Sequence, residues 1–428
     1  MKKVFIIIIT AYSFYSCETG TKITFVQPRK ESLHDSVYTI CKDIYFWNDR
    51  LPNSTEFGLY TQKDAKSILE HIRSYSPVHN DKYIDKWSFA INKVSWNAIE
   101  RNETTGFGFD VVFWKEDDLR VSQVYEASDV FEKGIKRGIR ILSINGIEAK
   151  LANNELLIKS LKDSKIAIDF IDSYENIHKT TILPTNFVKK TIINSKILDN
   201  DIAYFAFDIF EGKNTIKELN DVFAFFAANK AKELIVDLRY NHGGDGNIAL
   251  SLANLIAPKE SEGKVFTRII NNQKNSLFNY SLFFKPSISN NLGIKRVFFI
   301  TSPETASASE ALINSLEAIM EVKLIGSKTH GKPFGFFAIP IGDNYIFPIA
   351  FKNVNADGYG DYYDGLPVDI KAEDDLTHDF GDVEESCLKT ALHYINTGKK
   401  LQLKNNNDIN TLNFKNEKPD LFYFSHQK

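Results

Sequence analysis

The feature that most constrains the fold of this 428-residue chain is a regular alternation of strand-like and helix-like segments over residues 187–398. Short apolar runs typical of buried strands alternate there with longer segments whose apolar residues have helical spacing. In chain order, these segments are residues 202–207, 215–229, 234–238, 248–256, 297–301 and 307–320. Strands joined through helices run parallel, because each helix crosses over the sheet. The pattern therefore predicts a mostly parallel sheet covered by helices, in an α/β domain.

The remainder of the chain divides into an N-terminal region, a β-rich region and a tail, and a chain of this length is expected to hold about three domains. Residues 18–103 contain two apolar stripes at helical spacing, which predict a helical N-terminal domain. Residues 104–173 change to the two-residue period of strands, and Asn145 followed by Gly146 predicts a β-hairpin there. Residues 399–428 show no clear period, so we expect an irregular tail, although residues 421–424 could dock on the rest of the chain.

The first 17 residues have the composition of an export signal. Lys2 and Lys3 provide positive charge, and residues 4–15 form an apolar stretch too short to span a bilayer comfortably. Ser16 then precedes Cys17, as at the end of a bacterial lipoprotein signal, where the cysteine is lipidated and anchors the protein to a membrane surface. We therefore expect an exported protein of the cell envelope, in the periplasm or at the outer membrane. A plain secretory signal that happens to contain a cysteine is the alternative.

Composition argues against nucleic acid as a partner and against a zinc site or a disulfide framework. Lys and Arg together number 52 against 55 Asp and Glu, a net charge of −3, whereas nucleic-acid-binding proteins usually carry a strong basic excess. The three scattered cysteines form neither a disulfide framework nor a zinc pattern. Cys41 and Cys387 are predicted to be buried thiols in helices, and a bridge between them stays open. The acidic residues between positions 357 and 369 lack calcium-loop spacing, and we expect no metal or organic cofactor.

A candidate nucleophile lies between the strand at residues 297–301 and the helix that follows. Residues 305–310 read TASASE, which places the Ser307 hydroxyl at a helix start, where free N–H groups favour negative charge. An oxyanion formed beside Ser307 can be met by the N–H of Ala308. Ser307 and Glu310 also match a helix capping box, and taken alone this structural role is the stronger interpretation. The two roles are compatible, because Glu310 can brace the turn that presents Ser307.

Two glycine-containing motifs supply the other parts of a hydrolytic site. Residues 324–332 predict a strand and a loop that ends at Lys332, and burial can lower the pKa of a lysine enough to make it a base for serine. Residues 237–244 read DLRYNHGG, and the N–H of Gly243 or Gly244 is a candidate second oxyanion donor. A solvated surface lysine and an ordinary strand-to-helix turn are the alternatives for these two motifs.

Taken together, the three motifs resemble those of the carboxyl-terminal-processing, or tail-specific, serine peptidases. That family has a DLRxNxGG segment, an SASE segment and a GK segment in this order, and here they are residues 237–244, 307–310 and 331–332. The family lysine follows its serine by 25 positions, as Lys332 follows Ser307. The resemblance implies a Ser-Lys dyad on a crotonase- or Clp-protease-like α/β fold. It covers residues 30–398, and the chain looks like exported members from Bacteroidetes-type bacteria.

The family also carries a PDZ domain before its catalytic domain, and residues 104–173 resemble one. Residues 134–146 look like the GLxxGDxIxxING core of such a domain. The residues that look like its carboxylate-binding loop are Gly106, Phe107, Gly108 and Phe109. A loop of this kind binds a chain terminus through backbone N–H groups while the peptide adds a strand to the domain. The resemblance therefore implies polypeptide substrates that are recognised through their C-termini.

One position departs from the family pattern. Many members have a glutamine four positions after the lysine, where it is thought to orient the amine, and this chain has Phe336 there. His330 could assist or replace the lysine, and His242 is expected to be a loop residue. The predicted function is a serine endopeptidase that cleaves extended or unfolded polypeptides, of unknown oligomeric state. The alternatives are a non-catalytic PDZ binding protein with a degenerate peptidase domain and, less well supported, an acyl-CoA enzyme on the crotonase-like fold.

Overall fold

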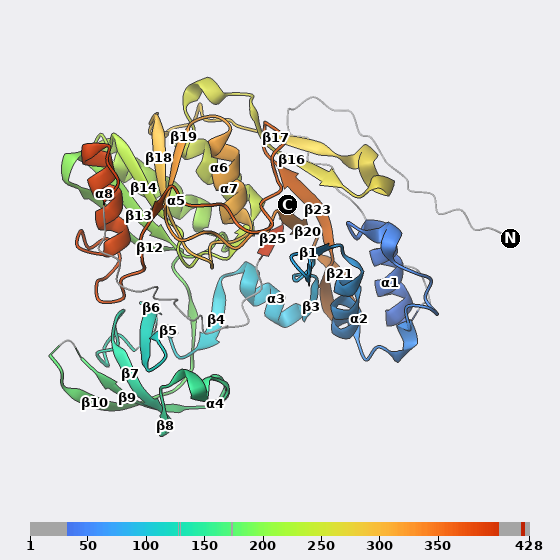
Figure 1. Ribbon diagram of the computed structural model, residues 1–428, viewed down its shortest axis with the longest axis horizontal. Coiled ribbons are helices and arrows are strands. Elements are labelled where there is room, and N and C mark those ends of the chain that lie inside the picture. Colours follow the sequence, from blue (N-terminus) through green and yellow to red (C-terminus); the bar gives the residue numbers. More distant parts are fainter. Residues whose placement is uncertain (1–31, 127, 129, 173, 402–420, 424–428) are drawn as a thin grey trace.

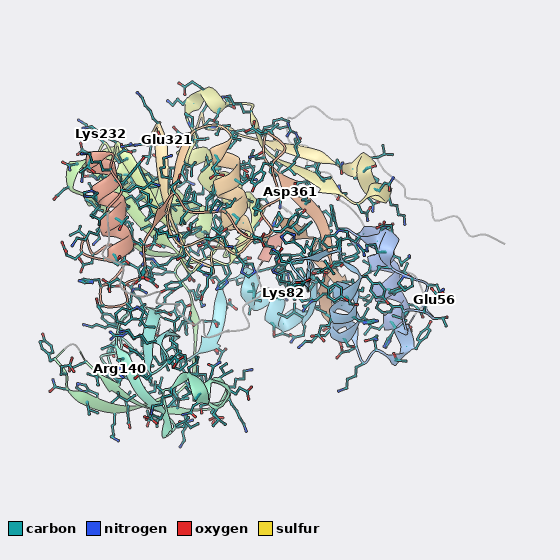
Figure 2. All side chains as sticks on the ribbon, viewed as in Figure 1. Glu56, Lys82, Arg140, Lys232, Glu321 and Asp361 are labelled. Atoms are coloured by element: carbon teal, nitrogen blue, oxygen red, sulfur yellow. The ribbon has the colours of Figure 1, made fainter. Side chains whose placement is uncertain are left out.

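The computed structural model describes residues 32–126, 128, 130–172, 174–401 and 421–423. Figure 1 shows a large α/β domain, a small β domain below it, and N-terminal helices on the other side of a second group of strands. Side chains fill the space between the elements, and the labelled Glu56 and Arg140 mark the N-terminal helices and the β domain (Figure 2). The predicted signal and Cys17 lie outside the described residues. Within those residues, no helix is long and apolar enough to cross a membrane.

The central sheet of the α/β domain has six strands. In spatial order they are β12 (Ile192–Leu198), β13 (Ile202–Phe207), β14 (Glu233–Asp237), β18 (Arg296–Thr301), β19 (Glu321–Gly326) and β24 (Ile370–Lys371). The edge strand β12 is antiparallel to β13, and every other neighbouring pair is parallel. The predicted, mostly parallel sheet is therefore confirmed. The three strands expected from apolar runs form its centre.

Helices cover both faces of this sheet. They are α5 (Thr215–Ala228), α6 (Gly246–Ile256), α7 (Ala308–Glu317) and α8 (Ser386–Thr397). Phe205 and Phe207 of β13 pack in one hydrophobic cluster with α5, α6 and α7, whereas Tyr204 and Ala206 pack in another with α8. Successive side chains of a strand point to opposite faces. Because both faces are covered, every residue of β13 is buried, which explains its continuous apolar run.

The N-terminal region shares its core with the α/β domain. It contains α1 (Leu33–Ile44), α2 (Ala65–Ile72), α3 (Lys93–Glu100), β1 (Val78–His79), β2 (Lys82–Tyr83) and β3 (Phe89–Asn92). Strand β3 pairs with β22 (Asn344–Phe347), which also pairs with β21 (Ile339–Ile341). The buried residues of α1 and α2 belong to the same hydrophobic cluster as those of α5 to α7. The N-terminal helices therefore form part of the main body of the molecule.

A four-stranded antiparallel sheet lies between the N-terminal helices and the central sheet (Figure 1). Its order is β17 (Tyr280–Phe283), β16 (Val265–Asn271), β23 (Ile349–Val354) and β20 (Phe334–Phe336). Phe334, Phe336 and Phe351 are fully buried there, in the same cluster as α7. Strand β20 begins two residues after Lys332, and β16 and β23 of the same sheet contact α7.

The β domain has a hydrophobic core of its own. Its strands are β5 (Phe109–Lys115), β6 (Asp118–Val124), β7 (Arg140–Ile144), β8 (Ile147–Glu148), β9 (Ile166–Ile171) and β10 (Ile177–Ile182), with one helix, α4 (Asn154–Ser160). The main strand order is β10-β9-β7-β6-β5, and β8 pairs with β7. Asn145 and Gly146 both have positive φ, 52° and 77°, as a tight hairpin between β7 and β8 requires, so the predicted hairpin is confirmed.

The β domain contacts the α/β domain through a buried ion pair. The two connections, β4 (Glu103–Gly106) and β11 (Thr185–Val188), pair with each other. Arg137 Nη2 lies 2.7 Å from Asp374 Oδ1, and Arg137 Nη1 donates to Tyr240 Oη at 3.2 Å. Burial acts to raise the pKa of Asp374, but the guanidinium groups of Arg137 and Arg239 lower it to about 2. Asp374 also pairs with Arg239, so Arg137 joins the β domain to a buried network of charges in the α/β domain.

The last described residues, 421–423, form a strand, whereas we expected an irregular tail. β25 (Leu421–Tyr423) pairs in parallel with β15 (Gly243–Asp245), which follows the DLRYNH residues of the glycine motif. Docking of this apolar segment was one of the two expectations for the tail.

Cys41 in α1 and Cys387 in α8 are both buried and free, so the disulfide bridge that the sequence left open is not formed.

Candidate active site

Ser307 occupies a strained backbone position at the start of α7. Its φ of 63° and ψ of −109° lie outside the regions that residues with a side chain normally adopt. The side chain is only 1% exposed, and among the described residues Oγ has no hydrogen-bond partner. A strained residue on a sharp strand-to-helix turn is the arrangement in which α/β hydrolases present a nucleophile. The backbone strain at Ser307 is thus expected for a reacting group.

The turn before Ser307 is fixed to the neighbouring strand end. Thr305 Oγ1 donates to the Leu238 carbonyl at 2.8 Å, and the Ala306 N–H donates to the Asn241 carbonyl at 3.0 Å. Ser309 Oγ donates to the Asn241 side chain at 3.0 Å. The carboxyl ends of β14 and β18, which are adjacent in the sheet, therefore bring the glycine motif and the serine motif together.

Glu310 fastens the serine turn to the lysine loop. One carboxylate oxygen, Oε2, accepts from the Ser307 N–H at 2.8 Å and from the Lys332 N–H at 2.9 Å. The other, Oε1, accepts from the Gly331 N–H at 2.6 Å and from Thr329 Oγ1 at 2.5 Å. Burial raises the pKa of Glu310, although these four bonds act to lower it. Because Ser307 and Lys332 bond to the same oxygen, their backbones lie side by side.

Lys332 is completely buried against aromatic rings. Its Nζ lies 4.1 Å from the ring centroid of Phe336 and 5.8 Å from that of Trp87. Position 336, where the family resemblance led us to expect glutamine, is thus filled by a fully buried ring beside the amine. The interpretation of Lys332 as a solvated surface residue is wrong, since its exposed fraction is 0%. Trp87 was not predicted as a site residue, because nothing in the local sequence links it to the lysine loop.

Of the two candidate oxyanion glycines, Gly244 is better placed. The Gly243 N–H donates to Asn241 Oδ1 at 2.9 Å, so it is already engaged. At Gly244, φ is 136°, and a Cβ would lie 2.4 Å from the Phe210 carbonyl oxygen, so only glycine fits. Ala308 is the first residue of α7, and its N–H is one of the first-turn groups that have no intrahelical partner. Gly244 and Ala308 thus remain as candidate donors.

The two histidines near the site are committed to other contacts. Trp87 Nε1 donates to His330 Nε2 at 3.3 Å, and His330 Nδ1 lies 3.2 Å from the Pro303 carbonyl. Both ring nitrogens of His330 therefore already have partners, and neither partner is Ser307. His242 Nε2 lies 3.4 Å from Glu304 Oε2, as a loop residue beside the site. Neither contact favours a histidine as the base.

The predicted peptide-binding loop lies in the β domain. Gly106 ends β4, and Phe109 begins β5. Phe107 and Phe109 are buried in the core of the β domain. Gly108 has a φ of 82°, and a Cβ there would lie 2.2 Å from Ser128 Oγ, so the loop requires glycine.

No group of three or more His, Cys, Asp or Glu side chains within the described ranges could hold a metal ion.

Comparisons of sequence place this site in a known family. The sequence profile of peptidase family S41 matches residues 201–371, which contain all three motifs. The carboxy-terminal processing protease CtpA of Bacillus subtilis (strain 168) is 27% identical over 267 residues, covering 60% of this chain and 54% of that relative. The chain therefore spans about half the length of the curated relative that it matches.

Solved structures share the fold. A protein assigned to the S41 proteases from Bacteroides fragilis NCTC 9343 superposes with a TM-score of 0.68 at 22% identity, over 88% of this chain and 99% of its own. The photosystem II D1 C-terminal processing protease superposes with a TM-score of 0.50 at 15% identity, over 83% of this chain and 95% of its own. At identities of 22% and 15%, these superpositions show a shared fold and nothing further.

The fold and the ordered motifs are thus similar to those of serine-type peptidases. More narrowly, residues 201–371 match peptidase family S41, and the chain is similar in sequence to a carboxy-terminal processing protease. The match to this family over residues 201–371 agrees with the resemblance seen in the sequence.

Proposed function

We propose that the chain is a serine endopeptidase in which Ser307 is the nucleophile and Lys332 the general base. The observation that carries the proposal is the single carboxylate of Glu310, which holds the strained backbone of Ser307 beside that of a fully buried lysine. Burial disfavours the charged ammonium, and a neutral amine is the form that accepts a proton from serine.

The proposed reaction is acyl transfer to Ser307 followed by hydrolysis. Ser307 Oγ attacks the carbonyl carbon of a peptide bond while Lys332 Nζ takes the hydroxyl proton. The N–H groups of Gly244 and Ala308 stabilise the negative charge on the carbonyl oxygen. Lys332 then gives the proton to the departing amine, and the carbon–nitrogen bond breaks. Water then attacks the ester carbonyl carbon while Lys332 takes one of its protons. The bond from that carbon to Ser307 Oγ breaks, Lys332 returns the proton to Oγ, and the shortened chain leaves with a new carboxyl terminus.

Hydrolysis of an unfolded protein tests the proposal. New amino termini are expected to accumulate with the wild type and not with Ser307→Ala. A Ser307→Ala variant that cleaves as fast as the wild type would disprove the assignment.

Phe336 is expected to set the acidic limit of activity. The ring under Lys332 Nζ favours the charged amine by a cation–π interaction of about 0.5–2 kcal/mol. Phe336→Leu removes this attraction while filling most of the same space. We therefore expect the acidic limb of the kcat/KM profile to move to lower pH by roughly 0.4–1.5 units. An unmoved or oppositely moved limb in a folded variant would show that the ring does not act on the base.

We also propose that the β domain is a PDZ domain that reads substrate C-termini. Residues 106–109 lead directly into β5, which lies at the edge of its sheet and pairs there only with β6 among the described strands. A glycine-containing loop at the start of an edge strand is the arrangement that captures a terminal carboxylate while the peptide extends the sheet. The substrate class that follows is extended polypeptide with a free C-terminus.

Matched substrates test C-terminal recognition. One unfolded substrate is prepared with a free carboxylate and the same substrate with a C-terminal carboxamide. Loss of a charge-assisted hydrogen bond, worth about 1.5–3 kcal/mol, is expected to lower kcat/KM about tenfold or more for the amide. Equal values for the two substrates would argue that the β domain does not read the terminus.

A further inference from the structure

A short strand near the end of the chain lies at the candidate active site. β25 runs parallel to β15, with Leu421 opposite Gly243, Phe422 opposite Gly244 and Tyr423 opposite Asp245. It also lies close to β20 and α7, the elements that begin just after Lys332 and Ser307. Figure 1 shows β25 beside β20, at the centre of the molecule. The backbone of residues 421–423 thus runs past the groups assigned to the reaction.

Gly244 provides the hydrogen-bonding groups on the side of β15 that faces β25. The opposite side bonds to Phe210, whose N–H donates to the Gly243 carbonyl at 2.9 Å and whose carbonyl accepts from the Asp245 N–H at 2.7 Å. The N–H and C=O of one strand residue point to the same side, and this side alternates along the strand. The N–H and C=O of Gly244 therefore face β25. In the observed register they meet the Leu421 carbonyl and the Tyr423 N–H.

This register brings a backbone carbonyl to a proposed oxyanion donor. The Gly244 N–H is the group assigned to the carbonyl oxygen of a cleaved bond, and the Leu421 carbonyl is the one opposite it. Among the described strands, β25 is the only one that pairs with β15. A strand edge beside a nucleophile binds an extended peptide by strand addition. β25 therefore makes the contact that a substrate backbone would make.

We propose that the edge of β15 is the strand-addition site for extended polypeptides and that residues 421–423 occupy it as a tethered competitor. The claim that β15 binds substrates rests on the proposed peptidase function. The claim that residues 421–423 compete for this edge rests on the parallel pairing of β25. A substrate then has to displace β25 before it reaches Ser307. The C-terminal segment accordingly lowers the activity of the chain that carries it.

Tethering sets the expected size of the effect. A segment linked to its own site reaches an effective concentration on the order of millimolar. A free peptide of the same sequence with a Kd of about 10–100 μM would then bind the full chain roughly ten- to hundredfold more weakly than a chain without the segment.

Peptide binding in the Ser307→Ala background tests occupancy, because no segment is cut there by the proposed reaction. A fluorescein-labelled peptide of residues 419–428 is titrated with the full chain and with a variant that ends at residue 418. Fluorescence anisotropy is expected to show at least about tenfold tighter binding to the shortened variant. Equal Kd values, or no binding to the shortened variant, would overturn the proposal.

Peptides methylated at one backbone nitrogen test the register. A methyl group on the Tyr423 nitrogen removes the N–H that faces Gly244, whereas one on the Phe422 nitrogen alters the opposite side of the same peptide. The first is expected to weaken binding to the shortened variant about tenfold more than the second. Equal losses would contradict the pairing of Tyr423 with Gly244.

These measurements separate the two proposals, since neither requires catalysis. Absence of cleavage by the wild type with and without residues 419–428 would refute the peptidase function and leave the binding result standing. Equal peptide affinities together with equal cleavage rates would refute occupancy and leave the peptidase function standing.

Discussion

Ser307→Ala is expected to lower kcat/KM on an unfolded protein by about ten-thousandfold or more, because no other group replaces the attacking oxygen. The substitution should hardly change stability. Oγ has no hydrogen bond among the described residues, so its removal leaves no donor or acceptor without a partner. Ser315→Ala is the matched control, since Ser315 is a buried serine of the same helix. We expect it to retain wild-type activity.

Substitutions of Lys332 separate a base from a fixed positive charge. Lys332→Met keeps most of the apolar stem and removes the amine, whereas Lys332→Arg keeps a charge that cannot be lost at accessible pH. Both are expected to lower kcat/KM by about a thousandfold or more, because neither can accept the serine proton. Activity above about a tenth of wild type in Lys332→Met would place the base elsewhere.

Glu310 is expected to give the largest loss of stability of any single site residue. Glu310→Ala leaves the N–H groups of Ser307, Gly331 and Lys332 buried without their acceptor. Stranding such groups is expected to cost about 3–5 kcal/mol in the free energy of unfolding, measured by urea denaturation. Glu310→Gln keeps the shape but turns one oxygen into a donor that faces other donors, so we expect a loss of about 2–3 kcal/mol.

Glu310 is a positioning residue, and activity measured on folded protein reveals that role. Below the unfolding transition of Glu310→Gln, kcat is expected to fall at least about tenfold while KM changes little, because a small displacement of nucleophile and base is costly. Thr329→Val is the control: it removes one of the four donors to Glu310, together with the acceptor of the Leu366 N–H, and should retain most of kcat. A Glu310→Gln variant with wild-type stability and kcat would contradict the fastening role.

Much of the fold could be predicted because its signals are local. β13 was predicted with its observed bounds from one apolar run, since a strand buried on both faces needs no alternation. The hairpin at Asn145 and Gly146 follows from residues that tolerate positive φ. The serine, lysine and glycine motifs were recognised from their order and spacing.

The parts that escaped prediction depend on contacts between distant segments. Glu310 was expected to brace its own turn, but its bonds to Gly331 and Lys332 join loops that are 21 and 22 residues away. The pairing of β3 with β22, which joins the N-terminal helices to the main body, spans more than 250 positions and has no local signal. The position of Trp87 near Lys332 follows from that pairing.

Covalent trapping tests the central claim most directly. The wild type and the Lys332→Met variant are incubated with a fluorophosphonate, an acylation mimic that leaves a stable adduct on an activated serine, and the modified peptide is identified by mass spectrometry. If Lys332 activates Ser307, the reagent modifies Ser307 alone in the wild type and reacts much more slowly with Lys332→Met. Modification at another residue, or equal rates in the two proteins, would contradict it.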